Sequence, residues 1–187
     1  WDRIDGEPAT VKSLYTGYVC ILAAIPAVCG IIGALLFGMS LLGVAGPMFL
    51  VPAVVGAIIS YIGALISVAV IALVMDALAT SFGATKNQIQ AFKVASYAFT
   101  PAWIAGILGI IPFLGALAMI VGGLYSLYVL YLGQPKLMRA PQDKAIGYVV
   151  VTVIVAVVVQ WVVVMLGAMI TASFALTSAA SMGAIYH

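Results

Sequence analysis

The sequence has 187 residues, of which 66% are hydrophobic and only 6% are charged, with a formal net charge of +2. Soluble domains contain roughly 45–50% apolar and about 25% charged residues, so a water-soluble core could not bury this much apolar surface. The small, dispersed charge also excludes nucleic-acid binding as the main activity. We therefore expect an all-α, polytopic integral membrane protein whose surface is largely solvated by the lipid bilayer.

Five stretches are apolar and long enough to cross a bilayer, since a transmembrane helix requires roughly 20 such residues. We expect a single transmembrane domain over 1–187, a five-helix bundle with spans at about 14–37, 53–80, 92–111, 113–132 and 145–169. Residues 38–56 are uncharged and rich in Gly and Pro, and we interpret them as a turn or short interfacial segment. The linker 133–144 holds two prolines and three cations, which predicts a loop.

The positions of Lys and Arg predict the topology. They number two before the first span, two around the loop between the second and third, three between the fourth and fifth, and none in the other connections. Because short loops rich in Lys and Arg stay in the cytoplasm, this alternation places the N-terminus inside and the C-terminus outside. The uncharged stretch from Ser13 to Met75 could instead make three crossings, but that alternative would place Lys86 and Lys93 outside, against the charge rule.

Asp76 is the only acidic residue within an otherwise unbroken apolar span. It lies near the predicted cytoplasmic end of the second span, where an unpaired buried carboxylate costs several kcal/mol. Lys93, across a short hairpin, is its candidate partner, and Tyr97 one turn further could donate a hydrogen bond. Three interpretations stay open: an ion or proton site that also uses Gln160, an ion pair that locks the hairpin, or a carboxylate that reaches cytoplasmic water.

Small residues recur at every fourth position in the second and fourth spans. This spacing lets membrane helices approach closely, so we predict a helix interface at each row. The six residues are Gly56, Ser60, Ala64, Ala118, Gly122 and Ser126.

Two further polar features lie near the end of the chain. Gln160 interrupts the valine-rich fifth span, and such a residue either lines a polar path or joins helices by hydrogen bonding. Lys136, Arg139 and Lys144 form a cytoplasmic basic loop before that span, which we expect to fix the orientation of the chain and to touch anionic lipid.

The common motifs of catalysis and metal binding are absent from the sequence. It contains no Ser–His–Asp set, no HExxH, no GxxxxGK[ST] and no GxGxxG. Its two cysteines, Cys20 and Cys29, are too far apart along a helix to pair within it. We therefore expect no enzyme, no catalytic residue, no cofactor and no metal site.

Three segments resemble the bacterial branch of the Yip family, membrane proteins related to the eukaryotic Rab-GTPase-interacting proteins. They read DALATSFGATKNQIQAFKVASYAFTPAW, GILGIIPFLGAL and GLYSLYVLYLGQPKLMRAPQDKAIGY. The resemblance implies five transmembrane helices with a cytoplasmic N-terminus, in the bacterial inner (cytoplasmic) membrane. Eukaryotic members are linked to vesicle traffic, membrane shaping and Rab binding. This chain lacks their long cytoplasmic N-terminal region, so a Rab-type GTPase is not an expected partner.

These observations predict a non-enzymatic, multi-pass membrane protein of the Yip type. It would act by helix–helix association, with itself or with another membrane protein, and by organising the bilayer. The alternative is a small transporter or channel for an ion, proton or small solute that uses the intramembrane Asp76. Prolines inside several spans suit this alternative, because irregular backbone in a membrane tends to line cavities.

Overall fold

The computed structural model describes the backbone of residues 1–42 and 47–183, and the side chains of 1–37, 51–111 and 113–173. Within these residues, five helical segments are long and apolar enough to cross a membrane. The segments are Val11–Phe37, Val51–Phe82, Gln88–Ile110, Phe113–Leu137 and Gln142–Ser173. The predicted all-α architecture with five spans is therefore confirmed.

Several of the spans combine more than one type of helix. The first joins a short α-helix, a π-helical segment and a long α-helix, and the third ends in a 3₁₀ segment. In chain order the elements are α1 (Asp2–Asp5), α2 (Val11–Leu14), η1 (Tyr15–Val19), α3 (Cys20–Leu42), α4 (Pro47–Ala79), η2 (Thr80–Phe82), α5 (Gln88–Ala105), η3 (Gly106–Ile110), α6 (Pro112–Leu137) and α7 (Gln142–Gly183).

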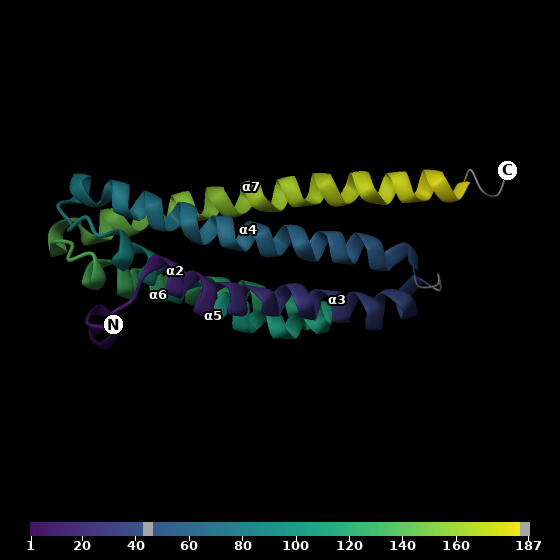
Figure 1. Ribbon diagram of the computed structural model, residues 1–187, viewed down its shortest axis with the longest axis horizontal. Helices are drawn as coiled ribbons and strands as arrows, with labels where there is room; N and C mark the ends of the chain where they lie inside the picture. The colour runs from purple at the N-terminus through teal and green to yellow at the C-terminus, as the bar shows by residue number, and fades with distance from the viewer. Residues whose placement is uncertain (43–46, 184–187) are drawn as a thin grey trace.

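The long helices lie side by side in two layers, α4 with α7 and α3 with α5 and α6 (Figure 1). α5 is the most buried span and packs against α3, α4 and α6. The N-terminal segment lies at one end of the bundle and α7 runs out at the other (Figure 1), as an odd number of crossings requires. α7 has 42 residues and is about 63 Å long, so the predicted end of the fifth span at residue 169 is not the end of the helix.

The linker predicted over 133–144 is mostly helical in the structure. α6 continues through Leu137, so that only four residues separate it from α7. Pro135 lies in the last turn of α6, and the chain closes behind it: Arg139 takes a left-handed φ of 51°, and the Ala140 N–H donates to the Pro135 carbonyl at 3.1 Å. This closure is a Schellman cap, which satisfies a carbonyl that the helix end leaves unpaired.

The turn predicted over 38–56 is also shorter than expected. α3 extends to Leu42 and α4 begins at Pro47, while residues 43–46 lie outside the described part of the chain. Proline at the first position of a helix sacrifices no hydrogen bond, because the N–H there has no partner within the helix. A tight turn separates the third and fourth spans, since Ile111 is extended and Pro112 opens α6.

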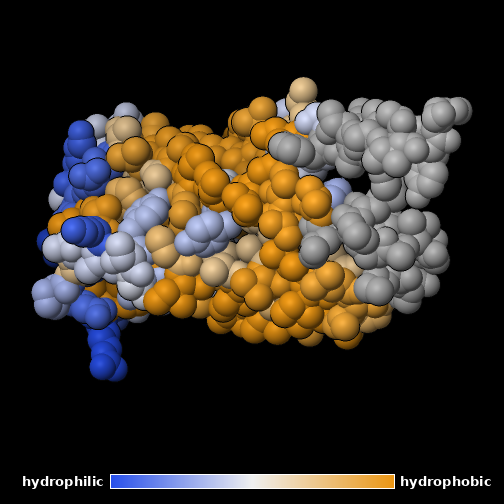
Figure 2. All heavy atoms as spheres, turned by 45° about the vertical axis from the view of Figure 1, so that its right-hand side comes forward, coloured by the Kyte–Doolittle hydropathy of each residue, from blue (hydrophilic) through white to orange (hydrophobic). Residues whose placement is uncertain are grey.

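All seven Lys and Arg and all five Asp and Glu come from the N-terminal segment, the loops and the helix ends at one end of the bundle. Figure 2 shows hydrophilic residues over this end and hydrophobic residues over the body beside it. We call it the charged end. That this end faces the cytoplasm stays a prediction of the charge rule.

The small-residue row of α6 packs against α5 of the same chain. A Cβ placed on Gly122 would come within 2.6 Å of the Ala105 Cβ and within 3.1 Å of the Pro101 carbonyl oxygen. One turn later, the Ser126 Oγ accepts a hydrogen bond from the Ala102 N–H at 3.2 Å. The close helix approach that the spacing predicts therefore occurs between α5 and α6 within one molecule.

The row in α4 is divided among different surroundings. Gly56 lies against Thr171 of α7, and Ala64 packs against the buried core. Ser60 is exposed, and its hydroxyl donates to the Ala57 carbonyl of the same helix at 2.9 Å. Both rows thus contribute mainly to contacts inside the chain.

We expect Gly122→Ala to lower the free energy of unfolding by about 1–3 kcal/mol, because the added methyl group would overlap α5. Gly123→Ala is the matched control, since a Cβ there meets nothing within 4 Å and removing a helical glycine is mildly stabilising. Thermal unfolding in detergent compares the two. Equal melting temperatures for both variants would contradict this packing.

Candidate functional site

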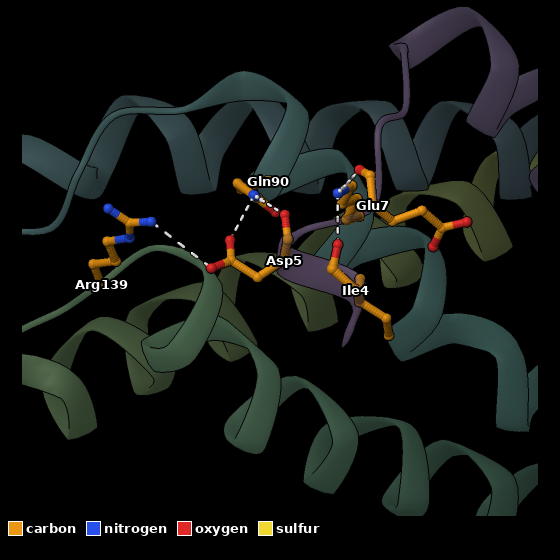
Figure 3. Close-up of polar contacts among 6 residues, drawn as sticks. Ile4, Asp5, Glu7, Gln90 and Arg139 are labelled. Carbon is orange, nitrogen blue, oxygen red and sulfur yellow. Dashed lines mark hydrogen bonds and ion pairs between the residues drawn. The ribbon is translucent and has the colours of Figure 1, made fainter. Parts of the chain in front are cut away.

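Residues 1–9, which we call the N-terminal strap, lie across the charged end and are held by Lys93 of α5. The Lys93 Nζ donates to the backbone carbonyls of Ile4 at 2.6 Å and Glu7 at 2.7 Å. Lys93 is only 2% exposed, so its ammonium group depends on these acceptors. Gln90, one turn earlier, donates through Nε2 to the Asp5 Oδ1 at 2.7 Å and to the Asp5 carbonyl at 3.2 Å (Figure 3).

The predicted basic loop also reaches the strap. The Arg139 Nη2 lies 3.8 Å from the Asp5 Oδ2 (Figure 3), and the Lys136 Nζ lies 3.2 Å from the Asp2 Oδ2. Lys144, the third cation of the loop, is exposed. Solvent-exposed ion pairs contribute only about 0–1 kcal/mol each, so the buried hydrogen bonds of Lys93 hold the strap more firmly.

Aromatic rings anchor the start of the strap. The indole of Trp1 lies over Gly133 of α6, where an added Cβ would come within 2.4 Å of the ring. Trp1 also meets the Tyr97 ring edge-on, with 6.3 Å between centroids, and Tyr97 packs against Tyr18 at 4.9 Å. These contacts join the strap to α5, α6 and the first span.

A second group of polar side chains lies just inside the charged end, between α4, α6 and α7. The Tyr148 hydroxyl donates to the Met75 carbonyl, the Gln134 Nε2 donates to the Thr152 Oγ1 at 2.7 Å, and that hydroxyl donates to the Tyr148 carbonyl at 2.9 Å. Gln134, Tyr148 and Thr152 are fully buried. With Asp76 they form what we call the polar cluster.

Two oxygen atoms of the polar cluster have no hydrogen-bond partner among the described residues. Both the Asp76 Oδ1 and the Gln134 Oε1 are buried. Asp76 directly follows Met75, whose carbonyl accepts from Tyr148, and Gln134 is joined to Tyr148 through Thr152, so both residues belong to this region between α4, α6 and α7. A buried acceptor without a donor costs about 1–3 kcal/mol, and more when it is charged.

The four residues predicted as an ion or proton site do not converge. Lys93 and Tyr97 lie one turn apart on α5, and both contact the strap. Asp76 lies in the polar cluster, and the described residues contain no ion pair between it and Lys93. Gln160 is exposed on α7, about 18 Å along the helix from Tyr148. The expected pairing of Asp76 with Lys93 is thus replaced by the bonds from Lys93 to the strap.

Sequence reasoning misses three members of the polar cluster. Gln134 falls in the stretch that we interpret as a linker, because Pro135 follows it and indicates a break. Tyr148 and Thr152 lie one turn apart in an otherwise apolar helix, and this spacing is the signal that could have found them. The strap carbonyls that bind Lys93 are backbone atoms, which no sequence motif marks.

Five membrane-crossing helices, with the charged side chains confined to one end, define a polytopic α-helical membrane protein. The chain belongs to the Yip1 domain family, whose model matches residues 1–164. It is 26% identical over 159 residues to the inner membrane protein YohC of Escherichia coli strain K12, an alignment that covers 83% of this chain and 82% of that protein. YohC of Escherichia coli O6:H1 strain CFT073 has the same identity and coverage. The predicted family and inner-membrane location are both confirmed.

No solved structure is significantly similar to the chain.

We expect Lys93→Met to release the strap, because the apolar side chain keeps the length of lysine but loses two charge-assisted hydrogen bonds. Hydrogen exchange of residues 1–9, measured by mass spectrometry, should become about tenfold faster or more. Lys136→Met removes only an exposed ion pair and should leave this exchange nearly unchanged. Slow exchange retained in Lys93→Met would show that something else holds the strap.

Proposed function

We propose that this protein is a non-enzymatic membrane scaffold, which associates with a second copy of itself through the outward face of α7 and so organises the surrounding bilayer. One observation carries the proposal: Gln160, a polar residue, is exposed on an apolar helix. It lies about 27 Å along α7 from Gln142, which places it within the roughly 30 Å hydrocarbon core.

The face around Gln160 is open to contact. The buried side chains of α7, in the part that the structure describes, are Tyr148, Val149 and Thr152, all near its start. Beyond them the side chains as far as residue 173 are half-buried or exposed. Its neighbours one turn away, Val157 and Val164, are large, apolar and each 56% exposed, and Trp161 on the adjoining face is 63% exposed. Val163, three residues on, instead packs against Gly63 of α4.

The chemistry of an amide favours a second copy as the occupant. Between membrane helices the hydrophobic effect supplies little attraction, so interhelical hydrogen bonds and close packing supply it instead. In a two-fold symmetric pair the same patch of both copies meets, and Gln160 of one molecule would face Gln160 of the other. An amide can donate and accept at once, so two facing amides satisfy each other.

The transport alternative has less support from the geometry than the sequence suggests, because Asp76, Lys93, Tyr97 and Gln160 lie in three separate places. The small-residue rows likewise offer little outward surface, since Gly122 and Ser126 are covered by α5. The proposal therefore moves the expected association surface from these rows to α7. It assigns no catalytic step, in keeping with the lack of a nucleophile–base set in the sequence.

We expect Gln160→Leu to weaken self-association by about 3- to 20-fold, which corresponds to the roughly 0.6–1.7 kcal/mol of an interhelical hydrogen bond in a membrane. Energy transfer between labelled copies in liposomes, followed over a range of protein-to-lipid ratios, measures the dissociation constant. Ser60→Ala is the control, because Ser60 is also an exposed polar residue but its hydroxyl bonds within its own helix.

Three outcomes would count against the proposal. Wild-type protein that stays monomeric at every protein-to-lipid ratio would exclude a second copy as the partner. An unchanged dissociation constant for Gln160→Leu would exclude this face of α7. Association that appears only with a different membrane protein would replace the second copy by that protein.

A further inference from the structure

The polar cluster contains more acceptors than it can satisfy. The hydroxyl proton of Tyr148 goes to the Met75 carbonyl, and that of Thr152 goes to the Tyr148 carbonyl. The amide nitrogen of Gln134 donates to Thr152. The Asp76 Oδ1 and the Gln134 Oε1 remain buried without a donor.

No cation of the described chain neutralises Asp76. Lys93, the partner predicted for it across the hairpin, is directed to the carbonyls of Ile4 and Glu7. The ion pairs of the charged end join Lys136 and Arg139 to the strap. The carboxylate therefore brings a negative charge into the bundle that the chain itself leaves unpaired, which is costly unless a ligand compensates it.

The oxygen atoms of the cluster define the class of ligand. Carboxylate, amide and backbone carbonyl oxygens suit hard cations rather than transition metals. Divalent cations usually gather several carboxylates, whereas this cluster supplies only the one from Asp76. A single carboxylate with neutral oxygens around it matches one positive charge.

We propose that the polar cluster is a binding site for a monovalent cation, with the Asp76 carboxylate and the Gln134 side-chain oxygen as its ligands. Tyr148 and Thr152 are positioning residues: Thr152 holds the nitrogen of the Gln134 amide, so that the oxygen is left for the cation. Asp76 lies in the last two turns of α4 and is partly exposed, so the cation enters from the charged end. This inference is independent of self-association through α7.

The test is the melting temperature of the full chain in nanodiscs, with NaCl or KCl compared against choline chloride at equal ionic strength. Binding to the folded state alone stabilises it, so Na⁺ or K⁺ should raise the melting temperature of the wild type by about 2–4 °C or more in a saturable way. Choline is too large to enter and controls for ionic strength.

Three variants locate the site. Asp76→Asn keeps the shape of the side chain but removes the charge, and should abolish the cation-dependent shift. Asp143→Asn removes an exposed acid in the first turn of α7 and should retain it. Gln134→Met leaves Asp76 in place but removes the amide oxygen, and should raise the half-saturating cation concentration about tenfold. If Asp76→Asn fails to fold, an unchanged half-saturating concentration in Gln134→Met would overturn the proposed site.

Equal shifts in all three salts would overturn the proposal, because they would reflect ionic strength alone. A cation response in Asp76→Asn equal to that of the wild type would overturn it as well. A wild type that responds to no salt would assign the two unpaired oxygens to ordered water instead.

Discussion

Hydrocarbon tolerates neither an unpaired backbone group nor an uncompensated charge, and this constraint arranges the whole molecule. The backbone satisfies it by forming helices, which pair their polar groups internally. The side chains satisfy it by gathering every Lys, Arg, Asp and Glu at one end, in the strap, the loops and the helix termini. Only Asp76 and Lys93 lie far enough along their helices to need polar partners inside the bundle. The partners of the two residues differ.

Lys93 is a donor and needs acceptors, which backbone carbonyls supply readily. The Ile4 carbonyl belongs to the short helix α1 and accepts from Lys93 in addition to the Gly6 and Glu7 N–H groups, so the strap supplies an uncharged acceptor. Asp76 is an acceptor and needs donors, but the donors around it serve Met75, Tyr148 and Thr152. The lysine is therefore enclosed by its own chain, whereas one buried oxygen of the carboxylate has no donor among the described residues.

The sequence predicts the features that the lipid bilayer imposes. It does not predict where a helix ends in a cap or which backbone groups a buried side chain binds. Long apolar runs and the alternation of cations give the five spans, because the bilayer fixes both helix length and charge placement. The C-terminal end of α6 is harder to predict, because Pro135 indicates a break whereas the helix continues to Leu137 and then closes in a Schellman cap through Arg139. The partner of Lys93 could not be predicted at all, because it consists of carbonyls far away in the sequence.

The small-residue rows are another case in which the sequence predicts a local property but not the tertiary contact that uses it. A row at every fourth position says that another helix comes close, but not which one, and Gly122 turns out to face α5 of its own chain.

The buried core and the open surface occupy different parts of α7, and this separation has a functional consequence. Near its start the helix is fixed by Tyr148 and Thr152, which contact α4 and α6. Around Gln160 and Trp161 its outer face is covered by no other described helix. Under the proposed self-association, a substitution at the outer face would therefore act on association and leave the hydrogen bonds of Tyr148 and Thr152 in place. α7 also packs on α4 as far as Thr171, so a neighbour could be accepted only on the side of α7 that faces away from α4.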